Sequence, residues 1–113
     1  MGGTRLTGQK GEQAALAYLR GQGLRFIEAN FQCKGGEIDL ILRDGEEVVF
    51  VEVRQRADGE HGGALASIGP AKVRRLVRAA SFWLLQRPPA PCRFDVVAIE
   101  DGRLEWLRNA IEV

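Results

Sequence analysis

The sequence predicts an α/β domain in which a mixed central sheet is flanked by helices. Apolar residues recur at helical spacing in two segments, 9–20 and 70–86. Between and after them lie short runs rich in valine and isoleucine, and two of the hairpins they form turn at an Asp-Gly pair. The resulting order of helix, three strands, helix and two strands is typical of a sheet covered by helices.

The chain is long enough for one ordinary domain with its own core, and we expect residues 1–113 to fold as a single unit. Hydrophobic residues make up 45% and charged residues 27% of the chain, which excludes a disordered or fibrous protein. No apolar run approaches the roughly 20 residues that span a bilayer, so no membrane partner is expected. Cys33 and Cys92 are isolated, without a zinc-binding spacing or a disulfide framework, so the expected setting is reducing and cytoplasmic.

The first helix is predicted over residues 9–20, with a cap at Thr7 and glycines after its last turn. Three apolar residues follow Glu12 at helical spacing: Ala15, Leu16 and Leu19. Glu12 therefore shares the core-facing stripe of this helix instead of its wet side. A first strand is expected over residues 24–31.

The hairpin of residues 36–56 carries acidic side chains inside both of its apolar strands. Asp39 interrupts the first strand, and Glu52 stands in the middle of VVFVEV. A two-residue loop at Asp44-Gly45 would place Asp39 opposite Phe50 and Glu37 opposite Glu52. Asp39 and Glu52 would then be diagonal neighbours, about 7–8 Å apart at the backbone. A three-residue loop or a bulge would instead separate the two acids.

Carboxylates that face one another repel, and a divalent cation removes that cost. Magnesium prefers carboxylate oxygens and keeps several waters, so two or three acids are enough protein ligands. Such an ion can polarise a phosphodiester and activate a bound water, while Arg54 could stabilise charge on the phosphate. The plainer alternative is a half-exposed hairpin with acids on its wet face. The apolar VVFVEV and the core-facing Glu12 argue against that alternative.

A glycine-rich segment, residues 57–69, predicts a mobile loop in which His61 is an exposed residue. Pro70 then fits the first turn of the second helix. Residues 71–94 contain no acid but six bases: Lys72, Arg74, Arg75, Arg78, Arg87 and Arg93. A solvated helix face and a phosphate-contacting surface are equally compatible with this segment. Within the helix, Lys72, Arg75 and Arg78 are expected nearer the outside.

Several segments together resemble the YraN family of bacterial proteins in order and spacing: GQKGEQAALAYL, GEIDLI, VVFVEVRQR, PAKVRRL and RFDVVAI. That family is assigned to the restriction-endonuclease-like, or PD-(D/E)xK, nuclease superfamily and is similar to archaeal Holliday-junction resolvases. The resemblance covers nearly the whole chain and implies an αβββαβ core, in agreement with the element order above. A resolvase needs two active sites, so the same analogy suggests a homodimer.

The resemblance also implies roles for individual residues. The helix acid of the superfamily falls on Glu12, its metal-binding aspartate on Asp39 and its second acid on Glu52. Glu37 belongs to the GEIDLI signature as an auxiliary acid, and Lys72 occupies a basic position of the family. The superfamily's lysine falls on Arg54, which is always charged and cannot act as a base.

The first hypothesis is therefore a Mg²⁺- or Mn²⁺-dependent endonuclease acting on DNA, with branched or damaged structures as candidate substrates. Its catalytic residues would be Asp39, Glu52 and Arg54, and Glu12 would join the two acids as a metal ligand. The residues expected to guide the nucleic-acid backbone are Lys72, Arg75 and Arg78. The second hypothesis is a nucleic-acid-binding module whose catalysis is weak or absent because of Arg54. The third is an accessory domain that docks another protein.

Overall fold

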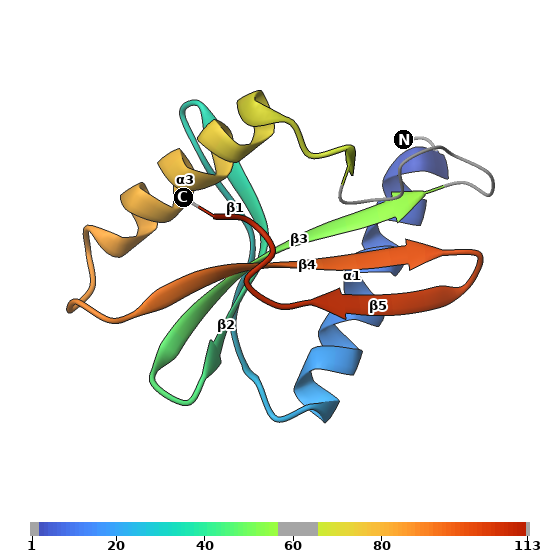
Figure 1. The fold of residues 1–113 in the computed structure, drawn as a ribbon, viewed down its shortest axis with the longest axis horizontal. Helices are drawn as coiled ribbons and strands as arrows, with labels where there is room; N and C mark the ends of the chain where they lie inside the picture. Colours follow the sequence, from blue (N-terminus) through green and yellow to red (C-terminus); the bar gives the residue numbers. More distant parts are fainter. Residues whose placement is uncertain (1–2, 57–65, 113) are drawn as a thin grey trace.

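The computed structural model describes residues 3–56 and 66–112, so His61 lies outside the described residues. The elements in chain order are α1 (Gly3–Gly21), β1 (Arg25–Cys33), β2 (Gly36–Asp44), β3 (Glu47–Arg56), α3 (Pro70–Leu84), β4 (Cys92–Glu100) and β5 (Arg103–Leu107). The five strands form one sheet in the order β1-β2-β3-β4-β5 (Figure 1). β3 and β4 are parallel and the other neighbours antiparallel, which confirms the predicted α/β class with a mixed sheet.

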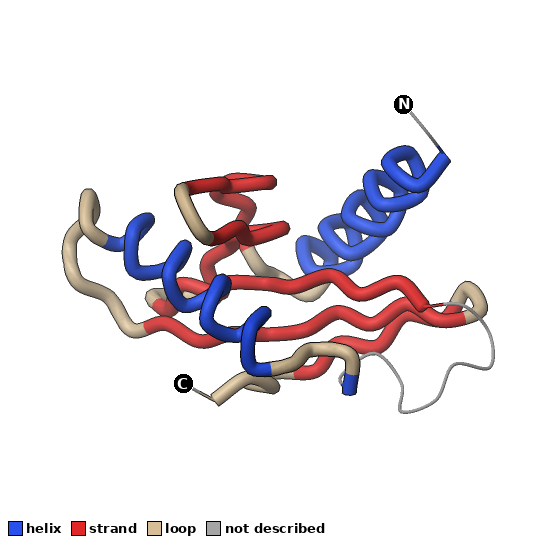
Figure 2. Tube along the Cα trace, turned by 90° about the horizontal axis from the view of Figure 1, so that it is seen from above, coloured by secondary structure: helices blue, strands red, loops and turns tan. Residues whose placement is uncertain are grey.

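The two helices cover opposite faces of the sheet (Figure 2). On the α3 face, Phe50 of β3 packs against Leu76 and Trp83 of the helix. On the α1 face, Val49 and Val51 of the same strand pack in a core with residues of α1. β3 is thus buried on both faces, as the continuous apolar run of VVFVEV predicts. No helix in residues 3–56 or 66–112 is both long and apolar enough to cross a membrane.

The helix boundaries differ slightly from those predicted. α1 begins at Gly3, so Thr7 lies inside the helix and is not its cap. α3 begins at Pro70 as predicted and ends at Leu84. The last hairpin turns at residues 101–102, where both backbone φ angles are positive, +53° and +76°. This confirms the Asp-Gly turn expected there, since a I′ turn requires positive φ at both central residues.

The β2–β3 turn lies one residue later than predicted. Asp44 pairs with Glu47, so the loop consists of residues 45–46. Gly45 has a φ of +64° and takes the first central position, where a II′ turn places glycine. The predicted pairs Asp39–Phe50 and Glu37–Glu52 are therefore wrong. A register shift of two residues does not by itself exchange the faces of the strands. Ile38 nevertheless packs in the same core as Ile41, and Leu40 packs in the opposite one, so the strict alternation predicted for β2 is broken around Asp39.

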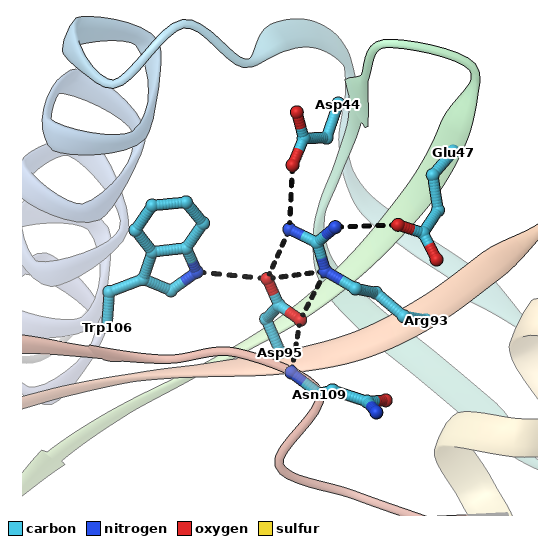
Figure 3. Close-up of polar contacts among 6 residues, drawn as sticks. All are labelled: Asp44, Glu47, Arg93, Asp95, Trp106 and Asn109. Atoms are coloured by element: carbon cyan, nitrogen blue, oxygen red, sulfur yellow. Dashed lines mark hydrogen bonds and ion pairs between the residues drawn. The ribbon is translucent and has the colours of Figure 1, made fainter.

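A buried polar network ties the β2–β3 hairpin to β4, β5 and the residues that follow (Figure 3). Asp95 is fully buried and accepts hydrogen bonds from Arg93, from Trp106 Nε1 at 2.9 Å and from the Asn109 amide at 2.8 Å. Arg93 also reaches two acids of the hairpin, with contacts of 2.7 Å to Glu47 and 3.1 Å to Asp44. Arg93 is thus committed to three carboxylates and is not part of a free phosphate-binding surface.

Candidate active site

The acids of the hairpin meet where β2 and β3 separate. The last backbone pair of the ladder is Leu40–Val51, and one further step brings Asp39 level with Glu52. At that point the Val53 amide donates a 2.9 Å hydrogen bond to Asp39 Oδ2. The carboxylate of Asp39 thus occupies the opening between the two strands. Asp39 and Glu52 are directly opposite one another, closer than the diagonal arrangement predicted from the sequence.

The carboxyl groups of Asp39 and Glu52 lie close enough for each to affect the pKa of the other. Glu52 is only 4% exposed, and burial, reinforced by the charge of Asp39, raises its pKa to about 7. Burial also raises the pKa of Asp39, although the Val53 amide and the charge of Lys72 oppose that rise. Two adjacent buried carboxyls resist ionising together, which is why the pKa values of both are raised.

Two cations from different elements flank this pair. Arg54 Nε lies 3.2 Å from Glu52 Oε2 but makes no hydrogen bond. Lys72 Nζ, from α3, lies 3.7 Å from the same oxygen. Glu52 Oε1 and Arg54 Nε are the two buried side-chain polar atoms of the described residues that lack a hydrogen-bond partner. An acceptor and a donor are therefore both left open at one place, which is costly unless a ligand satisfies them.

Lys72 does not lie on the outside of its helix as predicted. Its side chain is 16% exposed and donates a 3.3 Å hydrogen bond to Glu37 Oε2. Arg75, which is about half exposed, reaches the other oxygen of Glu37 at 3.6 Å. Glu37 thus orients two cations of α3 beside the buried acids. Arg78 is exposed, as predicted.

Glu12 approaches the pair from the opposite face of the sheet. It is partly buried on α1, as its place in the apolar stripe predicts, and burial raises its pKa, with the charge of Asp39 adding to the rise. Asn30 donates a side-chain hydrogen bond to Glu12. A cavity of about 320 Å³ opens beside these residues, with Gln13, Leu16, Ala29 and Leu40 as its other walls. Glu12 is the acid that lines this cavity.

Asn30 is a site residue that the sequence analysis missed. It lies across from Asp39, between the backbone pairs Ala29–Leu40 and Phe31–Ile38, and has a φ of +55°. Asparagine tolerates this left-handed conformation better than most residues, and such conformations cluster at functional sites. The only sequence signal was a polar residue inside an otherwise apolar strand, which does not by itself indicate a site.

A glycine allows α3 to bring its side chains this close. A Cβ on Gly36 would overlap the carbonyl oxygen of Arg75, so the backbone of α3 lies directly on the start of β2. A Cβ on Gly11 would lie 2.6 Å from Gln55 Oε1, the end of a flexible side chain that can move aside. A larger residue at position 36 would push α3 outward and move Lys72 away from the hairpin acids.

The donor set fits a hard divalent cation in part. Asp39 and Glu52 supply adjacent carboxylate oxygens, one of which is buried without a partner. Glu12 interacts with Asp39, but no three His, Cys, Asp or Glu side chains of the described residues form a group that could hold a metal ion. Four carboxyl groups face three cations, which leaves one excess negative charge when all are ionised: Glu12, Glu37, Asp39 and Glu52 against Arg54, Lys72 and Arg75.

The raised pKa of Glu52 makes the stability of the metal-free protein depend on pH. Glu52 titrates at about 7 in the folded protein and near 4.5 in the unfolded chain, so the folded state binds more protons between these values. The free energy of unfolding therefore falls as the pH rises through this window and levels off above the folded pKa. In EDTA, we expect Glu52→Gln to gain about 2–3 kcal/mol relative to wild type between pH 5 and pH 8. Urea unfolding measures this, with Glu46→Gln, at the exposed turn, tracking wild type; parallel curves for Glu52→Gln and wild type would contradict it.

Comparisons with known proteins agree with the resemblance seen in the sequence. The model of "Uncharacterised protein family UPF0102" matches residues 11–99. A UPF0102 protein of Janthinobacterium sp. (strain Marseille) is 56% identical over 108 residues, which cover 95% of this chain and 88% of the relative. UPF0102 proteins of Herminiimonas arsenicoxydans and Alkalilimnicola ehrlichii are 58% and 59% identical, over 95% and 92% of this chain and 87% and 85% of their own lengths. The chain is therefore a member of the UPF0102 family, the family identified above as YraN.

Proposed function

We propose that this protein is a divalent-metal-dependent nuclease that hydrolyses phosphodiester bonds in DNA. The observation that carries the proposal is the buried Glu52 beside Asp39, with an unsatisfied carboxylate oxygen next to an unsatisfied guanidinium N–H. A buried acidic pair of this kind weakens a fold unless it binds something. A divalent cation and a phosphate oxygen are the two ligands that would complete these atoms.

Asp39 and Glu52 would hold Mg²⁺ or Mn²⁺, while Glu12 interacts with the charge of Asp39 without forming a three-acid group with the pair. When bound, such an ion polarises the phosphodiester and lowers the pKa of a bound water. Glu52 must lose its proton to serve as a ligand, and its pKa of about 7 allows this at neutral pH. Arg54 is always charged, so its role is to hold the phosphate and not to accept a proton.

Lys72 supplies the amine that the resemblance places on β3. Lys72 Nζ, which comes from α3, lies 3.7 Å from Glu52 Oε2. Arg54 Nε approaches the same oxygen atom. An ammonium group there can donate to a phosphate oxygen as charge develops on it, which stabilises the transition state. Lys72 thus makes cleavage compatible with arginine at position 54.

We expect Lys72→Met to slow cleavage by about 10²–10³-fold, the usual loss for one donor to a developing oxyanion. Arg75→Met is the matched control, because Arg75 comes from the same helix, is 53% exposed and reaches only Glu37. Its effect should stay below about 10-fold, because an exposed ion pair contributes little. Single-turnover rates at saturating enzyme measure both. Equal losses of rate in the two variants would show that Lys72 has no specific role in cleavage.

The direct test of the proposal is incubation with Mn²⁺ and a panel of linear, single-stranded, flapped and four-way DNA. Cleavage is expected with wild type in Mn²⁺, and none in EDTA or with Asp39→Ala. Full cleavage by Asp39→Ala would overturn the proposal.

Arg54 favours a second candidate, a protein that binds DNA without cutting it. That candidate predicts salt-sensitive binding with no cleavage in Mn²⁺, and cleavage that appears in Arg54→Lys.

A further inference from the structure

A groove between β1 and the second half of α3 has no role in the site described above. Its volume is about 340 Å³, within the range of about 300–1,000 Å³ usual for small-ligand pockets. One wall is the end of β1 and the residue after it, with Phe31, Gln32 and Lys34. The other is the last turn of α3 and the residues that follow it, with Phe82, Gln86 and Arg87. Both elements also carry residues near the acid cluster, so the groove and the site are neighbours.

The lining combines an aromatic face with cations and amides. Phe82 is 50% exposed, an unusual position for a large aromatic ring. Lys34 lies at the edge of the groove, and the guanidinium of Arg87 stacks 3.6 Å over the ring of Trp83. Gln32 and Gln86 are exposed and make no side-chain hydrogen bond to other described residues. None of the lining residues is acidic.

We propose that this groove binds an unpaired nucleobase of the nucleic-acid substrate, an inference that rests on the proposed nuclease function. Phe82 offers a ring face on which a base can stack, and every base has such a face. The amides of Gln32 and Gln86 present donors and acceptors to its edge, and Lys34 attracts an adjacent phosphate. Arg87 is already paired with Glu28 at 3.9 Å and donates to the Trp83 carbonyl. A base in a duplex has its faces covered by its neighbours, so only an unpaired base can enter.

The groove lies beside the acid cluster. Gln32 is paired across the β1–β2 hairpin with Glu37, whose carboxylate contacts Lys72 and Arg75. A base held in the groove would therefore place its own strand along α3, next to Asp39 and Glu52. The substrate class that this arrangement selects is DNA with unpaired nucleotides beside the cleaved bond, such as a flap or a junction.

The exposed apolar side chains of Phe82 and Leu85 could also suggest that this surface binds a second copy of the chain. The charge of the surface argues against it. Arg74 and Arg78 flank the same apolar side chains and form no ion pair with other described residues. Two such faces would bring like charges together, because residues 71–94 contain no acid. A nucleic acid, in contrast, would be attracted to these cations through its phosphates.

The test uses a single-stranded oligonucleotide with one 2-aminopurine, whose fluorescence falls when it stacks, and its duplex as the comparison probe. In EDTA, we expect wild type to bind and quench the single strand, and to quench the duplex far less. Phe82→Ala should weaken single-strand binding by about 5- to 100-fold, the usual effect of one lost stacking partner. Leu85→Ala, also on α3 and 77% exposed, is the matched control and should bind as wild type.

A second variant keeps the test informative if Phe82→Ala perturbs the helix. Lys34→Met should reduce the slope of log affinity against log salt by about one. Equal binding of both probes by wild type and Phe82→Ala, with cleavage in Mn²⁺ retained, overturns the groove assignment and leaves the nuclease proposal standing. The groove assignment is also overturned if wild type forms a dimer that Phe82→Ala dissociates and if wild type does not quench the 2-aminopurine fluorescence. No binding and no cleavage of any DNA overturns both proposals.

Discussion

Asp39→Asn is expected to abolish cleavage, with a loss of more than about 100-fold, because even partners of a metal ligand usually cost 10- to 100-fold. The substitution keeps the size of the side chain, and its amide group can still accept the hydrogen bond of the Val53 amide. It removes the charge that lies against Glu52 and, with it, one of the two carboxylates proposed to hold the ion. Single-turnover cleavage in Mn²⁺ measures the loss.

The same variant has a readout that does not depend on activity. The charge of Asp39 is the second cause of the raised pKa of Glu52, after burial. We therefore expect the pKa of Glu52 to fall in Asp39→Asn, as followed by the carboxyl chemical shift, while burial keeps it above 4.5. Calorimetric Mn²⁺ titration should show weaker binding. Glu46→Gln, which removes an exposed acid of the same hairpin, should leave cleavage, Mn²⁺ binding and the Glu52 pKa unchanged.

If Asp39→Asn cleaves at the wild-type rate, the acidic pair is structural and the nuclease proposal fails. If Mn²⁺ binding is lost but DNA binding and the folded structure persist, the pair is a metal site as proposed. These results are separable because the Val53 amide keeps a hydrogen-bond acceptor in the variant.

Arg93→Met is expected to lower the free energy of unfolding by about 3–5 kcal/mol, because it leaves a buried charge without its partner. Asp95 is 0% exposed and keeps only Trp106 Nε1 and the Asn109 amide as donors after the substitution. Asp44 and Glu47 of the β2–β3 hairpin also lose their contact with β4. Urea or thermal unfolding measures the change.

Arg103→Met is the control for this prediction, since Arg103 is exposed on β5 and should change stability by less than about 0.5 kcal/mol. A double variant, Arg93→Met with Asp95→Leu, distinguishes the unpaired charge from lost packing. It should recover part of the stability, because removing both partners of a buried pair is less harmful than removing one. Equal stability of Arg93→Met and wild type would mean that water reaches Asp95.

The sequence predicts the fold and much of the site because those features follow from local periodicity. Glu12 lies in the apolar stripe of a helix, and the apolar run of VVFVEV is long enough to be buried on both faces. The two-residue repeat of β3 places Glu52 on the side of Val48 and Phe50, and a register shift of two leaves that side unchanged. The same repeat fails in β2, where Ile38 and Leu40 pack in opposite cores. The Asp101-Gly102 turn is likewise encoded by its own residues.

The errors concern interactions between distant segments. The β2–β3 register was misplaced because Asp44-Gly45 and Gly45-Glu46 are both acceptable turns, and the pairing of whole strands chooses between them. Lys72 was expected outside, but the close approach of α3 to Gly36 turns its side chain onto Glu37 and Glu52. No local pattern reports such an approach.

Local pattern alone therefore determined the order of the elements, the apolar stripes of the helices and the burial of β3 on both faces. Only the tertiary structure decided what each charged group meets: Asp39 at the opening of the ladder, Lys72 over Glu52, and Arg93 between acids 46 and 49 residues away in the chain. The physical reason is that periodicity acts over a few residues, whereas the energy of a buried charge depends on partners brought close by the whole fold.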